Sequence, residues 1–164
     1  MFFRELFAAL EAAGVSYAVV GGVALNLHGV PRMTYDIDLV VATTAESLRT
    51  CRELLERLGL RCRLPLVLED LATLERRREL EDERNLLAVT FTDPSNPLRE
   101  VDVLVAPSLD PDGVCARAVT KRTESLVVRV AHIDDLLAMK RAAARPQDLA
   151  DVAHLERLRR GPRS

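Results

Sequence analysis

The sequence has few of the features that mark secreted, membrane-embedded or nucleic-acid-binding proteins. Its 164 residues include no tryptophan, four phenylalanines, two tyrosines and three cysteines. Cys51, Cys62 and Cys115 are odd in number and lack the spacing of metal ligands, which indicates reduced thiols of a cytoplasmic protein rather than a disulfide or zinc framework. No apolar run approaches transmembrane length, and the N-terminus lacks the pattern of a secretory signal. The formal net charge of -2 provides no general attraction to nucleic acid or to an anionic membrane.

The composition is that of an ordinary globular protein. Hydrophobic residues make up 48% of the chain and charged residues 29%, so nothing indicates disorder. We expect a single domain over residues 1–164, with its core at about 15–130 and a C-terminal helical segment at about 133–160.

Hydrophobic spacing predicts an alternation of short strands and amphipathic helices. Apolar and alternating runs predict strands at 17–20, 36–41, 86–92, 99–105 and 126–130. Helical spacing predicts helices at 2–13, 22–28, 43–59 with its caps, 69–84, 134–143 capped by Asp134, and 146–159. The turn-forming stretch at 93–97 predicts that its flanking strands form an antiparallel hairpin.

Two aspartates stand one residue apart at the start of the strand predicted at 36–41. Successive strand residues point to opposite faces, so Asp36 and Asp38 share a face. Two neighbouring carboxylates repel each other unless a cation lies between them. Their hard oxygen atoms suit Mg²⁺, which proteins often hold between carboxylates and substrate phosphates.

A glycine pair ends the first strand. Gly21 and Gly22 have no Cβ atoms, so backbone N–H groups there can approach a phosphate closely, and the following helix contributes the positive end of its dipole. Together with Asp36 and Asp38, the pair indicates a nucleoside triphosphate site.

A third aspartate interrupts a valine-rich strand. Val101, Val103 and Val105 share one face, and Asp102 lies on the other. A buried carboxylate is costly unless it is paired or metal-bound, so we assign Asp102 as the third carboxylate of the site. The alternative is a half-exposed residue on an edge strand.

Lys140 falls on the apolar stripe of the predicted helix 134–143. Either its ammonium extends to the surface along its own methylenes, or it points into the site and contacts triphosphate oxygens. Asp148 and Asp151 near the start of the last helix have a plain explanation as acids favoured by the helix dipole. We interpret His28 as a packed helix residue rather than a catalytic base.

These residues together resemble a known family. Gly21-Gly22, Asp36-Ile37-Asp38 after thirteen intervening residues, and Val101-Asp102-Val103 are similar to the motifs of the DNA polymerase β-type nucleotidyltransferase superfamily. Within it, the chain resembles small bacterial nucleotidyltransferases related to the abortive-infection (AbiEii-like) toxins, since Lys140 and the segment 145–151 are similar to that group's Lys…Arg-x-x-Asp-x-x-Asp pattern. One departure is Gly22, where many members have serine.

The resemblance implies an α/β (α+β) fold, a mixed β-sheet packed by helices, with helices at the C-terminus. It implies metal-dependent transfer of a nucleoside monophosphate from an NTP to a hydroxyl, with release of pyrophosphate. Asp36, Asp38 and Asp102 would be the catalytic, metal-binding carboxylates for Mg²⁺ or Mn²⁺. Nucleotide contacts are assigned to Gly21, Gly22, Arg32, Thr34 and Lys140, although Arg32 and Thr34 are equally explained as turn residues. Asp148 matches the family's late acidic position.

The sequence leaves the acceptor open among an RNA end, a protein and a small hydroxylated molecule. A cognate antitoxin is an expected partner by resemblance, and a membrane is not. The competing hypothesis is a non-catalytic nucleotide- or partner-binding module, such as an antitoxin or regulatory subunit. Three clustered carboxylates disfavour it, because a purely structural domain gains nothing from their repulsion.

Overall fold

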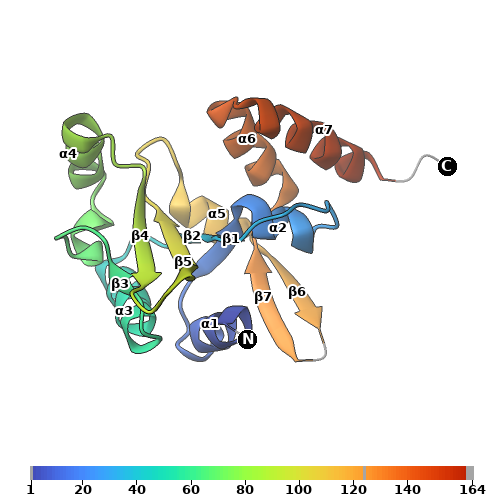
Figure 1. The fold of residues 1–164 in the computed structure, drawn as a ribbon. Coiled ribbons are helices and arrows are strands. Elements are labelled where there is room, and N and C mark those ends of the chain that lie inside the picture. The colour runs from blue at the N-terminus through green and yellow to red at the C-terminus, as the bar shows by residue number, and fades with distance from the viewer. Residues whose placement is uncertain (1, 124, 162–164) are drawn as a thin grey trace.

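A computed structural model describes residues 2–123 and 125–161, which form helices around a seven-stranded sheet (Figure 1). The helices are α1 (Phe2–Ala12), α2 (Gly21–Leu27), α3 (Ala45–Arg57), the 3-10 helix η1 (Leu68–Ala72), α4 (Leu74–Arg84), α5 (Pro111–Arg117), α6 (Ile133–Ala143) and α7 (Pro146–Arg160). The strands are β1 (Tyr17–Val20), β2 (Ile37–Val41), β3 (Arg61–Cys62), β4 (Ala88–Asp93), β5 (Asn96–Leu104), β6 (Val119–Thr123) and β7 (Leu126–Val130).

The sheet is mixed, as the family resemblance implied. Its strand order is β3-β4-β5-β2-β1-β7-β6. β2 pairs in parallel with β5, and β1 with β7, while the other neighbours are antiparallel. The predicted hairpin is confirmed as β4–β5. The strand that carries Asp102 is therefore an interior strand, not an edge strand.

One face of the sheet is buried under α1 and α3. Phe7 of α1 stacks on Tyr17 of β1 with ring centroids 6.4 Å apart, and Arg99 of β5 donates to the carbonyl of Leu58 just after α3. Tyr17, Arg99 and the buried Val101 lie on this face, because side chains two residues apart along a strand point to the same side of the sheet. This face supplies most of the hydrophobic core.

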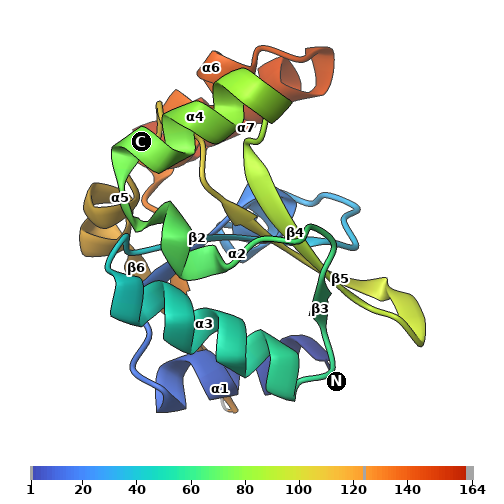
Figure 2. The same cartoon turned by 90° about the vertical axis from the view of Figure 1, so that its left-hand side faces the viewer.

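The opposite face carries the polar residues. In Figures 1 and 2, α4 and the pair α6–α7 rise on this side of the sheet, while α1 and α3 lie on the other. Asp38 and Asp102 alternate with the buried Ile37 and Val101, so their side chains project toward this second side. Among the described residues, none of the helices combines the length and apolarity needed to cross a bilayer.

The structure corrects three details of the sequence interpretation. The predicted helix 69–84 is split at Thr73, whose hydroxyl accepts from the Arg76 amide and so caps α4. Helix α6 is capped by His132, whose Nδ1 accepts from the amide of Asp134, so Asp134 lies inside the first turn. The sequence also gave no sign of α5 or β6.

Candidate active site

Strand pairing brings the three predicted carboxylates together. Asp38 of β2 and Asp102 of β5 are register partners in the parallel pair, and Asp36 precedes β2 by one residue. One oxygen from each of the three side chains lies within 4.8 Å of the others, and all three residues are half-buried. We call Asp36, Asp38 and Asp102 the carboxylate cluster.

Burial and mutual repulsion both perturb the cluster. Burial raises the pKa of Asp38 to about 7, and the charges of Asp36 and Asp102 add to the rise, while those of Lys140 and Arg145 oppose it. The nearby cations therefore compensate only part of the negative charge. An arrangement of this kind favours binding of a further cation.

Two threonine hydroxyls orient the cluster. Thr34 Oγ1 donates to Asp36 Oδ1 over 2.9 Å, and Thr90 Oγ1 on β4 donates to Asp102 Oδ1 over 2.5 Å. Thr90 is the register partner of Asp102 in the hairpin. The sequence analysis did not single out Thr90, although pairing the two predicted strands correctly would have found it.

The glycine pair lies directly against the cluster. Gly21 has φ +64°, a left-handed conformation, and a Cβ there would overlap Asp38 Oδ2. A Cβ on Gly22 would lie 2.8 Å from both Cβ and Oγ1 of Thr34. Both positions therefore need glycine for close packing around the site. Their predicted contact with a phosphate stays a prediction.

The predicted nucleotide contacts Arg32 and Lys140 meet in a second charged group. Lys140 is 8% exposed, and its Nζ donates to Asp148 Oδ1 over 2.9 Å and lies 3.1 Å from Asp151 Oδ2. Arg32 Nη1 also binds Asp151 Oδ2. The lysine thus does not extend to the surface, and the loop before Asp36 is tied to α7.

Asp148 binds two of the cations. It is fully buried, and its Oδ2 accepts from Arg145 Nε over 2.8 Å. Burial acts to raise the pKa of Asp148, but hydrogen bonds from Arg145 and Lys140 outweigh it and lower the pKa to about 2. The helix dipole alone does not account for Asp148 and Asp151, because both are buried and ion-paired. We call Arg32, Lys140, Arg145, Asp148 and Asp151 the C-terminal ion network.

Arg145 is a residue that the sequence analysis did not assign to the site. Its charge, like that of Lys140, lowers the pKa of Asp38, so both cations act on the carboxylate cluster. The sequence feature that could have identified Arg145 as a site residue is its position at the start of the Arg-x-x-Asp-x-x-Asp segment. His28, in contrast, lies with Nε2 2.9 Å from the carbonyl oxygen of Ala131, as expected of a packed helix residue.

The carboxylate cluster fits a divalent metal. It offers only hard oxygen ligands, burial and the neighbouring carboxylates raise the pKa of Asp38, and hydroxyls fix two of its three side chains. These properties match the oxygen ligands that Mg²⁺ and Mn²⁺ prefer.

Comparison with solved structures identifies the fold as that of nucleotidyltransferases. The chain is similar to ANT(2'')-Ia in complex with adenylyl-2''-tobramycin, at 16% identity and a TM-score of 0.61, over 93% of this chain and 84% of that one. It is also similar to the lincosamide antibiotic adenylyltransferase LnuA bound to lincomycin, at 13% identity and a TM-score of 0.60, over 94% and 96% of the two chains. No curated protein matches the sequence.

The particular family follows from the sequence. The model of the nucleotidyl transferase AbiEii toxin of type IV toxin–antitoxin systems matches residues 4–163. The protein therefore belongs to the AbiEii nucleotidyltransferase toxin family, as the motifs had indicated.

Proposed function

We propose that the protein transfers a nucleoside monophosphate from a metal-bound NTP to a hydroxyl group, with release of pyrophosphate. The observation that carries this proposal is the convergence of Asp36, Asp38 and Asp102 beside the cations of the C-terminal ion network. Three carboxylates would hold the divalent metal, and Lys140 and Arg145 lie close enough to act on Asp38. Such a pairing of acidic and basic groups suits a magnesium triphosphate.

Divalent metal would stabilise the charge that develops on the attacking and leaving oxygens of an in-line displacement. The chain's own residues supply orientation and proton transfer. Asp102, fixed by Thr90, accepts the proton of the attacking hydroxyl as its oxygen bonds to the α-phosphorus. The bond from the α-phosphorus to the bridging oxygen breaks, and pyrophosphate leaves.

Several groups would bind the triphosphate. The backbone of Gly21 and Gly22 packs against Asp38 and Thr34, and its N–H groups would bind a phosphate at the cluster. Lys140 has one ammonium proton beyond those directed at its two carboxylate partners. Arg32 and Lys140 are fixed by buried aspartates, so they would contact a nucleotide with little loss of side-chain entropy.

The class of acceptor is inferred from the chemistry of the reaction and not from an acceptor-binding site. Any acceptor must present a hydroxyl, and we retain an RNA end, a protein side chain and a small hydroxylated molecule. Tobramycin and lincomycin, the antibiotics named for the two similar structures, illustrate the last class. Family membership favours a cognate antitoxin as partner. We place the activity in the cytoplasm, consistent with three free cysteine thiols.

The test is a label-transfer assay. Protein with Mg²⁺ and each of four α-labelled NTPs is incubated with total RNA, total protein or a pool of small hydroxylated metabolites. We expect label in one fraction, and its loss in Asp102→Asn. Glu100→Gln is the matched control, because Glu100 lies two residues earlier on β5 and pairs with Arg63 at 2.9 Å outside the cluster. Equal transfer by wild type and Asp102→Asn would contradict the assignment.

A further inference from the structure

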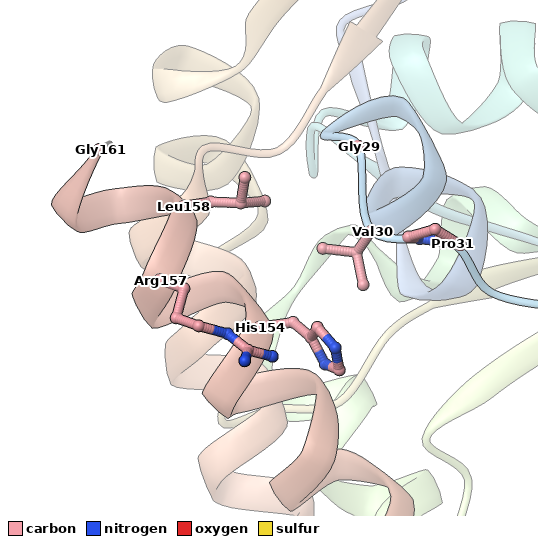
Figure 3. A pocket seen from close by; sticks show the side chains of 7 residues that line it. All are labelled: Gly29, Val30, Pro31, His154, Arg157, Leu158 and Gly161. Atoms are coloured by element: carbon pink, nitrogen blue, oxygen red, sulfur yellow. The ribbon is translucent and has the colours of Figure 1, made fainter. Parts of the chain in front are cut away.

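A pocket separate from the carboxylate cluster lies between the loop after α2 and the last helix (Figure 3). Its volume is about 350 Å³, which falls in the range of small-molecule sites. None of its residues belongs to the carboxylate cluster or the C-terminal ion network. The lining consists of Gly29, Val30 and Pro31 on one side and of His154, Arg157, Leu158 and Gly161 on the other.

Part of the pocket is apolar. Val30 and Pro31 face Leu158 across it, and Leu158 is 41% exposed although it is aliphatic (Figure 3). Val30 is already buried, but covering the exposed Pro31 and Leu158 with an apolar group would remove hydrocarbon surface from water, which is favourable. The pocket therefore suits a ligand with a compact apolar body.

The other part of the pocket is cationic. Among neighbouring arginines, Arg159 pairs with Asp134, and Arg160 and Arg141 both pair with Glu156. Within residues 2–123 and 125–161, Arg157 makes no such pair, and its side chain extends along the pocket toward His154 (Figure 3). An unpaired guanidinium beside an apolar wall is complementary to a carboxylate attached to an apolar body.

His154 completes this end of the pocket. Its Nδ1 lies 2.9 Å from the carbonyl oxygen of Ala150 in the preceding turn. Because a carbonyl only accepts, Nδ1 carries the proton, and Nε2 of the neutral ring is an acceptor that leaves Arg157 as the donor for a carboxylate. The ring and the Arg157 guanidinium thus present two polar groups beside the aliphatic wall.

We propose that this pocket binds a small amphipathic carboxylate, with its apolar body between Pro31 and Leu158 and its carboxylate on Arg157. The ligand would bridge the loop that leads to Arg32 and the helix that carries Asp151. These are the two segments that the Arg32–Asp151 ion pair already joins. The proposal does not depend on nucleotidyl transfer, so it stands or falls separately from the proposed function.

The test is an NMR titration of the full-length protein with four probes: benzoate, acetate, benzyl alcohol and benzylamine. Benzoate has both the charge and the apolar body, and each of the others lacks one or carries the opposite charge. We expect benzoate to shift the amide signals of Gly29, Val30 and residues 154–158, and to bind more tightly than the other three. Equal binding of benzoate and benzylamine, or of benzoate and acetate, would overturn the proposal.

Two variants locate the charge. Arg157→Gln is expected to weaken benzoate binding by about tenfold, the scale of a lost charge-assisted hydrogen bond. Arg159→Gln is the matched control, since Arg159 lies on the same helix but pairs with Asp134, and it should leave the affinity unchanged. Loss of affinity in both variants, or in neither, would show that Arg157 is not the anion contact. The amide spectra also show directly whether each variant remains folded.

Discussion

The carboxylate cluster and the C-terminal ion network both contain aspartates, but the charges of these aspartates are compensated to different extents. In the cluster, burial and neighbouring carboxylates raise the pKa of Asp38 to about 7. In the network, Asp148 is more deeply buried, yet hydrogen bonds from Arg145 and Lys140 lower its pKa to about 2. Burial acts to raise the pKa of both carboxylates, and hydrogen bonds from cations reverse its effect at Asp148 only.

This difference separates two roles. The network is internally paired and holds Arg32 and Lys140 in place without any ligand. The cluster is incompletely compensated and gains stability only when a cation binds. On the proposed function, they would form a site whose cationic part is preorganised and whose acidic part is completed when a metal nucleotide binds.

The largest expected effect concerns catalysis. Replacing Asp38 by Asn should reduce nucleotidyl transfer by about 10³-fold or more, the scale on which loss of one member of a catalytic constellation acts. The measurement is the initial rate of label transfer at saturating Mg²⁺ and NTP. Wild-type rates in this variant would remove Asp38 from the active site.

Breaking the network should cost stability instead. Asp148→Asn leaves Lys140 and Arg145 with one buried carboxylate fewer, which we expect to destabilise the fold by about 3 kcal/mol. For a chain of this length the Tm should fall by about 6–12 °C in calorimetry. Asp134→Asn is the control, because the Asp134 side chain is 61% exposed, and its Tm should stay within about 2 °C of wild type. Equal Tm values for Asp148→Asn and wild type would show that the network does not stabilise the fold.

Removing a carboxylate from the cluster should instead increase the stability of the metal-free fold. Without metal at pH 8, Asp38→Asn relieves repulsion and should stabilise the fold by about 1–2 kcal/mol, less than the pKa shift implies because the amide must also be desolvated. Because the folded pKa of Asp38 is raised from 3.8 to about 7, the cost of Asp38 appears as the pH rises between these values. The gain should therefore vanish near pH 4. A destabilised variant at pH 8 would contradict the repulsion.

The stabilisation by Asp148 should depend on pH in acid. The folded pKa of Asp148 is depressed, so its contribution is complete above about pH 4 and is lost as the pH falls toward 2. The contribution is about 2 kcal/mol. Urea unfolding at pH 5 and pH 2.5 should show the gap between wild type and Asp148→Asn narrowing in acid. A gap that stays constant would mean that Asp148 does not titrate as the ion pairs require.

The three carboxylates of the cluster could be predicted from the sequence, but the ion pairs of the network could not. Asp36 and Asp38 could be placed on one face because strand periodicity is strictly two, and Asp102 alternates with buried valines in the same way. Thr90 was not found, since its contact with Asp102 depends on the register of a hairpin. The alternation of residues in the sequence shows on which face of a strand a side chain lies, but not which residue of the neighbouring strand it contacts.

Long-range contacts explain the remaining differences. Helical spacing placed Lys140 on an inward stripe, but it could not show that Asp148 and Asp151 of the next helix, α7, are its partners. Helix α5 has only seven residues, and the edge strand β6 is mostly polar in sequence, so neither gave a distinct hydrophobic pattern. Asp134 is a residue type that often caps helices, yet the N-cap of α6 lies two residues earlier, at His132.

Mn²⁺ binding followed by electron paramagnetic resonance tests the central contrast most directly. Wild-type protein with a non-hydrolysable NTP analogue should bind Mn²⁺, Asp38→Asn should not, and Asp148→Asn should still bind it at a temperature where the variant is folded. The cluster would then be the metal site and the network its support. Mn²⁺ binding that survives Asp38→Asn but is lost in folded Asp148→Asn would reverse these roles and contradict the account.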